Sequence, residues 1–94
     1  MESKLTSKAL SEAVHQWGLE ESTESTLLQT IDHGILLEID LYLTSLFPHD
    51  AFLCRFWLSR RQEALGENPI ALMISRGNEG ASLVRAYLAH LISS

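Results

Sequence analysis

Residues 68–92 read NPIALMISRGNEGASLVRAYLAHLI, and this stretch decides the class of fold. Asn68 has the side chain of a helix N-cap, and Pro69 suits the first helical position because no backbone N–H is needed there. Apolar residues follow at helical spacing up to Gly77, which predicts a short helix that ends at this glycine. After a turn at 78–80, a second apolar stripe predicts an amphipathic helix that runs almost to the C-terminus. Its members are Leu83, Val84, Tyr87, Leu88, Leu91 and Ile92.

The segment before this stretch predicts another helix and a turn. Pro48 interrupts the chain after Phe47 and suits the first turn of a helix over about 49–61. An apolar band of large side chains on this helix is expected to face the core. Arginines in its C-terminal half complement the helix dipole, and residues 64–67 are expected to form a turn. The band consists of Phe52, Leu53, Phe56 and Trp57.

Residues 23–46 carry one long apolar stripe with helical spacing, which predicts one or two helices. Gly34 is the position at which this stripe can bend or divide. Residues 37–44 also alternate between apolar and polar, which is typical of a half-buried strand. Helix is the preferred interpretation because no second alternating run with a hairpin turn is present to pair with such a strand. The stripe consists of Leu28, Ile31, Ile35, Ile39, Tyr42, Leu43 and Leu46.

The N-terminal segment predicts a helix over about 7–17. Thr6 or Ser7 is the candidate N-cap, and Gly18 suits the left-handed position after the last turn. The apolar positions of this helix are Leu10, Ala13, Val14 and Trp17. The whole chain is therefore expected to be all-α, a single compact bundle of five or six helices.

Composition limits the classes of function that are open to this chain. Its 94 residues fit one domain, and a hydrophobic content of 46% is enough to form a core. A small bundle of this composition does not bury every aromatic side chain, and an exposed remainder implies a protein partner. A net charge of -5 disfavours non-specific attraction to nucleic acid. The sequence has neither the apolar core of a signal peptide nor a membrane span, so we expect a cytoplasmic protein without membrane contact.

Motifs for metal, cofactor or catalytic chemistry are missing from the sequence. It contains no HExxH, CxxC or EF-hand pattern and no P-loop, so neither a metal nor a cofactor is expected. No nucleophile motif is present either, and we expect a protein that is not an enzyme. A small metal- or ligand-binding enzyme remains an open alternative because the chain has four histidines, and Cys54 is expected to be a packed thiol. The histidines are His15, His33, His49 and His90.

The order of motifs in the C-terminal half resembles the toxin-binding domain of the MbcA/ParS/Xre antitoxins. In that family a Trp-Leu pair ends one helix, a loop of the type Leu-Gly-Gly-x-x-Pro starts the next, and a glycine-containing turn leads into a last amphipathic helix. The similarity covers roughly residues 35–92. The matching motifs are Trp57-Leu58, Ala64-Leu65-Gly66, the run from Pro69 to Met73, Gly77, Gly80, Val84 and Leu88.

The resemblance implies a function and a surface. Residues 35–94 would form a helical domain that binds a RES-domain toxin, an enzyme that acts on NAD or uses it to modify targets, and neutralises it by covering its active-site entrance. The expected contacts lie in the loop before Pro69 and on the last helix, because an interface needs a few large anchors within a polar rim. The candidate partner-binding residues are Trp57, Gln62, Leu65, Gly66, Pro69, Arg76, Arg85, Tyr87 and His90.

Further implications concern DNA and self-association. Family members usually carry an N-terminal helix-turn-helix region, but residues 1–34 are a short helical region that is too small for a complete one. Lys4 and Lys8 are its only basic residues, so DNA binding is expected to be weak or absent. Family members commonly dimerise, and the apolar stripe over 23–46 is the expected contact for a homodimer. The alternative function is a stand-alone helical dimerisation, adaptor or transcription-regulator protein without a toxin.

Overall fold

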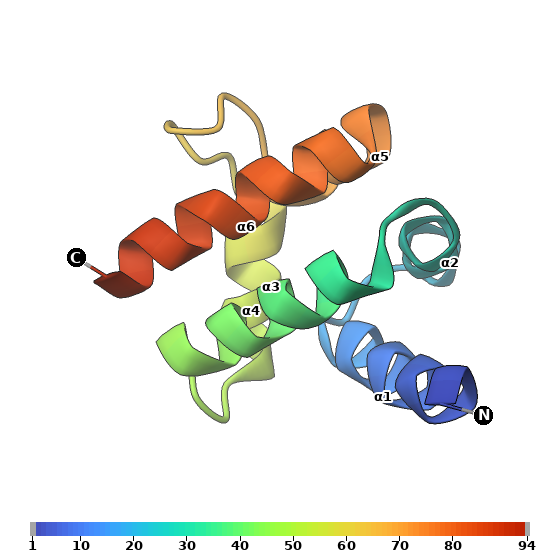
Figure 1. Cartoon of the computed structure of the whole chain (residues 1–94). Helices are drawn as coiled ribbons and strands as arrows, with labels where there is room; N and C mark the ends of the chain where they lie inside the picture. The colour runs from blue at the N-terminus through green and yellow to red at the C-terminus, as the bar shows by residue number, and fades with distance from the viewer. Residues whose placement is uncertain (1, 94) are drawn as a thin grey trace.

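Six helices make up the computed structural model of this protein, which describes the backbone of residues 2–93 and the side chains of residues 8–93 (Figure 1). They are α1 (Glu2–Gln16), α2 (Glu21–Thr30), α3 (His33–Leu46), α4 (Ala51–Ser59), α5 (Pro69–Arg76) and α6 (Asn78–Ser93). Within these backbone bounds no strand forms, apart from a single bridge between Gln62 and Glu67. The prediction of an all-α bundle of five or six helices is confirmed. The strand interpretation of 37–44 is wrong, because α3 spans all of these residues.

One hydrophobic core holds the helices together. Helices α3 and α6 lie side by side, α5 packs on α6, and α1 packs on α3 (Figure 1). None of the helices within 2–93 is both long and apolar enough to cross a bilayer. The core takes side chains from both ends of the chain, which include Leu10, Val14, Trp17, Leu36, Ile39, Leu43, Leu58, Met73, Val84 and Leu88.

The apolar stripe over 23–46 is divided between α2 and α3, but not at Gly34. The break falls at Ile31 and Asp32, two to three positions earlier, because the Asp32 carboxylate caps α3 and accepts hydrogen bonds from the backbone N–H groups of Gly34 (2.9 Å) and Ile35 (3.3 Å). Three members of the stripe, Ile31, Ile39 and Leu43, are buried inside the chain. The stripe therefore serves mainly the core of one molecule, and these three residues are not accessible for a homodimer contact.

The first helix begins earlier than expected. It starts at Glu2, ahead of Thr6 and Ser7, so neither residue begins the helix, and their side chains lie outside the described ones. Gly18 has a φ of 73°, which confirms the predicted left-handed residue after the helix.

Helix α4 starts after the proline and not with it. Pro48 lies in the turn between α3 and α4, so the prediction that it occupies a first helical turn is wrong. The Asp50 carboxylate caps α4 by accepting a hydrogen bond of 3.0 Å from the backbone N–H of Leu53. The helix ends at Ser59, two residues before the predicted end at 61.

The motifs that opened the sequence are found as expected in α5. Asn68 Oδ1 accepts a hydrogen bond of 2.7 Å from the N–H of Ala71, Pro69 is the first helical residue, and Gly77 ends the helix with a φ of 58°. The turn at 64–67 is also present, closed by the Gly66 N–H, which donates to the carbonyl of Gln62.

The predicted turn at 78–80 is replaced by the first turn of α6. Asn78 begins this helix, and its Oδ1 accepts a hydrogen bond of 2.6 Å from the backbone N–H of Asp32. Gly80 is needed here for space rather than for a turn, because a Cβ at this position would lie 2.3 Å from the carbonyl oxygen of Leu72. The start of α6 is thus held against both α5 and the junction of α2 and α3.

Candidate functional site

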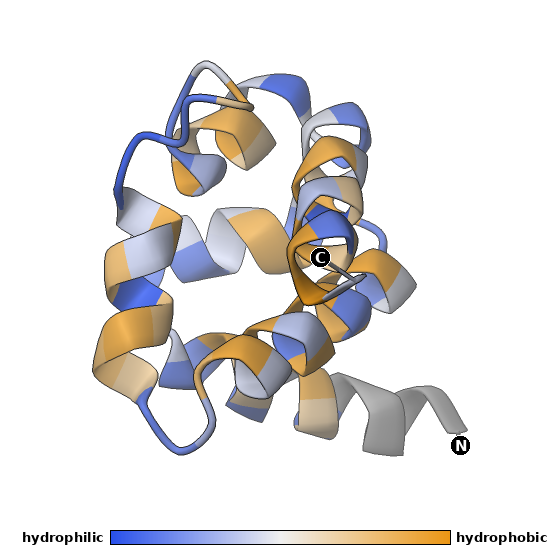
Figure 2. Cartoon of the chain, turned by 90° about the vertical axis from the view of Figure 1, so that its left-hand side faces the viewer, coloured by the Kyte–Doolittle hydropathy of each residue, from blue (hydrophilic) through white to orange (hydrophobic). Residues whose placement is uncertain are grey.

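Helix α4 exposes most of the apolar band that the sequence predicts to be core. Phe52 is 63% exposed and Phe56 is 49% exposed, so for these residues the core prediction is wrong. The helix faces the core through Cys54 and Leu58, which are both buried. Phe52 and Phe56 each lie two positions earlier, and at 3.6 residues per turn this directs them to the opposite side. Figure 2 shows the strongly hydrophobic colouring of α4, the helix at the left of that view.

Arginine side chains lie among these exposed rings. The guanidinium carbon of Arg55 is 5.7 Å from the ring centre of Phe52, and that of Arg60 is 5.6 Å from the ring centre of Phe56. Within the part of the chain whose side chains are described, no carboxylate forms an ion pair with Arg55, Arg60 or Arg61. The α4 face therefore combines exposed aromatic surface with unneutralised positive charge.

A groove of about 530 Å³ runs beside this face, between α4, the residues that follow it, and α6. One wall is a stacked aromatic pair, Trp57 and Tyr87, whose ring centres are 6.2 Å apart at an interplanar angle of 24°. Gln62 fixes the chain after α4, because its Nε2 donates to the carbonyls of Trp57 (3.1 Å) and Arg60 (3.3 Å). We call this feature the α4 groove, and its lining residues are Phe47, Leu53, Phe56, Trp57, Arg60, Arg61, Gln62, Glu63 and Tyr87.

Three of the candidate partner-binding residues, Trp57, Gln62 and Tyr87, meet in the α4 groove. The others do not line it. Leu65 packs against the core and Pro69 is buried, whereas Gly66 is exposed in the loop.

The remaining candidates lie on or beside α6. Arg76 is exposed and forms an ion pair with Glu79, while Arg85 Nη1 lies 3.0 Å from Glu38 Oε1. His90 is exposed in the last turn of α6. The groove residues that the candidate partner-binding set missed are Phe47, Leu53, Phe56, Arg60, Arg61 and Glu63. A signal that could have identified Phe56 and Arg60 is their spacing of four positions at the end of α4, which lets the Arg60 guanidinium reach the Phe56 ring.

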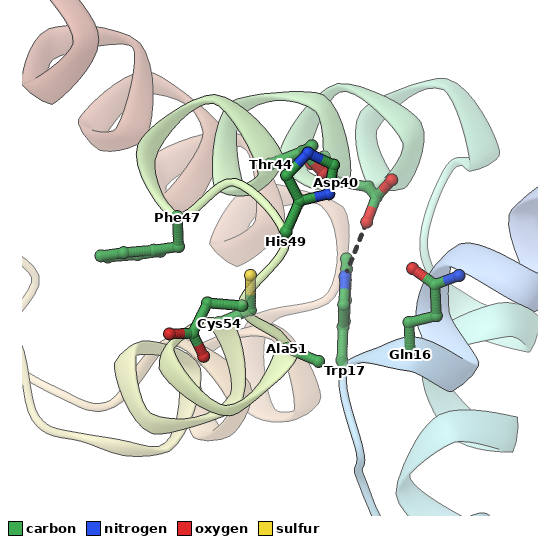
Figure 3. A pocket seen from close by; sticks show the side chains of 9 residues that line it. Gln16, Trp17, Asp40, Thr44, Phe47, His49, Ala51 and Cys54 are labelled. Atoms are coloured by element: carbon green, nitrogen blue, oxygen red, sulfur yellow. Dashed lines mark hydrogen bonds between the residues drawn. The ribbon is translucent and has the colours of Figure 1, made fainter.

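A second, smaller pocket of about 230 Å³ lies between the end of α1, α3 and the start of α4 (Figure 3). Trp17 and Asp40 point toward one another across it, and the indole Nε1 donates a hydrogen bond of 3.0 Å to Asp40 Oδ1. Burial raises the pKa of the Cys54 thiol above its ordinary value, and the carboxylates of Asp40 and Asp50 raise it further. No three His, Cys, Asp or Glu side chains among the described ones gather in a way that could hold a metal ion. In this pocket the hydrogen bond to Asp40 holds the Trp17 side chain in place.

Cys54 is expected to react slowly with iodoacetamide at neutral pH. Its raised pKa leaves a smaller fraction as thiolate than an exposed thiol has at the same pH, and burial limits access of the reagent. We expect alkylation to be at least about tenfold slower in the folded chain than in urea, because the reagent reaches the buried thiol only when the chain opens locally. Mass spectrometry over time measures both rates, since Cys54 is the only cysteine. Equal rates in the two states would contradict a packed thiol.

The α4 groove has the composition of a protein-binding surface, because aromatic side chains and arginine are enriched at interface hot spots. Comparisons of the chain with protein-family models, with curated proteins and with solved structures give no match. The groove and the order of the sequence motifs are therefore the two observations that bear on function.

Proposed function

We propose that this chain is an antitoxin-like protein that binds a RES-domain toxin and neutralises it by covering the entrance to the toxin's active site. The observation that carries the proposal is the α4 groove, because it is lined by Trp57, and the Trp57-Leu58 pair is one of the motifs in which the chain resembles the MbcA/ParS/Xre toxin-binding domain. In this function the chain catalyses no reaction and needs no cofactor. It acts in the bacterial cytoplasm with weak or no binding to DNA, as a homodimer whose contact does not include the buried Ile31, Ile39 and Leu43.

The contacts around the groove suit a role in blocking an opening on another protein. The Trp57–Tyr87 stack presents a large aromatic surface from two helices, so it needs little ordering on binding. The loop beyond it is held by the bond between the Gln62 N–H and the Glu67 carbonyl, and it ends in the capped start of α5. A short, braced loop beside aromatic anchors can occupy a concave site without paying much conformational entropy.

Co-expression with the product of the adjacent gene tests this function. We expect that product to be toxic alone and harmless together with this chain, and we expect the two proteins to co-purify. Arg61→Glu should weaken the complex about tenfold or more, because it places a negative charge in the groove, and it should leave the melting temperature unchanged. Isothermal titration calorimetry measures the affinity, and differential scanning calorimetry measures the melting temperature.

Lys8→Glu is the matched control, since it makes the same charge change at an exposed position of α1 outside the groove. It should leave the affinity within about twofold of the original, which is less than about 0.5 kcal/mol. An adjacent product that neither poisons cells nor binds this chain would refute the antitoxin function. An equal loss for both variants would refute the assignment of the groove.

A second candidate is a helical adaptor or dimerisation protein without a toxin. The exposure of Phe52 and Phe56 favours it, because an aromatic surface of this kind fits protein partners of many classes. Stable pull-down of a non-toxic protein through the α4 groove, with no growth effect from the adjacent gene, would favour this candidate.

A further inference from the structure

We infer that the α4 face binds an amphipathic protein segment that carries carboxylates beside its apolar anchors. The inference rests on the proposed function in one respect, which is that both use the α4 groove. It adds the chemistry of the partner. Three arginines, Arg55, Arg60 and Arg61, lie on or directly after α4 among exposed aromatic and aliphatic side chains. An occupant must both cover this apolar surface and neutralise this charge.

The distribution of charge points to an acidic occupant. The chain carries 12 acidic residues against 7 Lys and Arg, yet three of those seven basic residues gather at α4. Arg76 and Arg85 are already paired with carboxylates of the same chain. The α4 arginines have no such partner among the described side chains, and the one acidic residue of the groove is Glu63. A local positive patch on a negative protein selects partners by charge complementarity.

The geometry of the α4 face fits a helix with apolar anchors better than an isolated ion. Phe52 and Phe56 are one helical turn apart, with ring centres 6.4 Å from each other, and they form a continuous apolar ridge. Beside this ridge, the groove volume of about 530 Å³ is large enough to take bulky side chains. A helix that lies in a groove uses anchors three or four positions apart, which matches the spacing of the ridge.

The arginines are placed to bind carboxylates at the edge of the apolar surface. Arg55 and Arg60 lie over the rings of Phe52 and Phe56, so their planes are supported while their N–H groups stay accessible. Guanidinium groups in such positions can donate two parallel hydrogen bonds to one carboxylate. Glutamate or aspartate beside the apolar anchors of the partner would therefore complete the contact.

Two other occupants fit the face less well. A second copy of this chain that paired α4 symmetrically on α4 would bring both sets of Arg55, Arg60 and Arg61 together, and like charges at an interface are unfavourable. Nucleic acid could stack on the phenylalanines, but it needs an extended basic track, and the chain has a net charge of -5. Both occupants are outcomes of the test below.

NMR titration of the ¹⁵N-labelled full chain tests the inference without any toxin. The first probe is a helical peptide of about 15 residues with leucine and phenylalanine on one face and glutamate on its flanks, and the second has lysine in place of glutamate. We expect the acidic probe to shift the amide signals of residues 52–62 and to bind at least about tenfold more tightly than the lysine probe. Added salt should weaken this binding.

Variants separate the charge contribution from the apolar one. Arg60→Glu with Arg61→Glu should reverse the preference between the two probes, whereas Lys8→Glu should leave it unchanged. Phe52→Ser with Phe56→Ser should reduce binding of the acidic probe about tenfold or more without lowering the melting temperature, because both side chains are largely exposed.

Each contrary result overturns the inference in a different way. Absence of shifts at α4, or equal binding of the two peptides, would show that acidic apolar segments are not what this face selects. Tighter binding of a single-stranded oligonucleotide at α4 would assign the face to nucleic acid. Shifts at α4 that depend on protein concentration alone would assign it to a second copy. A failed toxin co-expression leaves the peptide result standing, so the two proposals can fail separately.

Discussion

Trp17→Ala is expected to lower the free energy of unfolding by about 3–5 kcal/mol. The Trp17 side chain is only 1% exposed and is the largest of the fully buried ones, so its removal leaves a cavity where α1 meets α3. The substitution also leaves the Asp40 carboxylate without the hydrogen bond of 3.0 Å that it accepts from the indole. Since small domains are stable by only about 5–15 kcal/mol, the variant would lose a large part of its stability.

Urea unfolding followed by circular dichroism measures this loss. Trp17→Phe keeps most of the aromatic volume but removes the N–H donor, so a smaller loss of about 1–3 kcal/mol is expected. Trp57→Ala is the matched control at the other tryptophan, which is only half-buried at the rim of the α4 groove, and it should cost less than Trp17→Ala. The anchoring role of Trp17 would be disproved if Trp57→Ala destabilised the chain by the same amount or more.

The parts of the fold that the sequence predicts well are those with local signals. The start of α5 depends on the Asn68 cap and Pro69, and its end depends on Gly77, so three nearby residues define the helix. The caps Asp32 and Asp50 have weaker local signals. The apolar stripe over 23–46 continues across Asp32, and Pro48 stands close to Asp50. An apolar stripe shows which residues can be buried together, but it does not show where the backbone hydrogen bonds of a helix end.

The exposed face of α4 could not be predicted from its pattern. Every residue of this helix except Arg55 and Ser59 is apolar, so two different stripes satisfy helical periodicity. Which stripe is buried depends on how the helix packs on the remainder of the chain. The structure buries the stripe with the smaller Cys54 side chain and exposes the phenylalanines.

The sequence predicts only part of the candidate site, because a motif does not show which of its residues the fold buries. Trp57 and Gln62 are close in sequence, and the similarity in motif order added Tyr87, which α6 brings onto the indole of Trp57. The same similarity also marked Pro69, whose ring the fold buries at the start of α5. A motif thus identifies positions that matter without separating those that build the scaffold from those that face a partner.

Gly80→Ala is expected to destabilise the chain by about 3 kcal/mol, at the upper end of the range for overpacking. The added Cβ would lie 2.3 Å from the carbonyl oxygen of Leu72 and 2.9 Å from its carbonyl carbon. These atoms belong to the backbone of α5, which is capped by Asn68 and cannot move aside as a side-chain end can. Relief of the contact therefore requires α5 and α6 to separate.

Gly34→Ala is the matched control for Gly80→Ala. Its new Cβ would meet only the Asp32 carboxylate oxygen, at 3.1 Å, and alanine is the better helix former by about 1 kcal/mol, so little net change is expected. Thermal unfolding by calorimetry compares the two variants. Because α6 also carries Tyr87, a displaced α6 would open its stack on Trp57, and Gly80→Ala should weaken partner binding even where the variant stays folded. Unchanged stability together with unchanged binding would show that α5 and α6 can separate without cost, contrary to the close packing at Gly80.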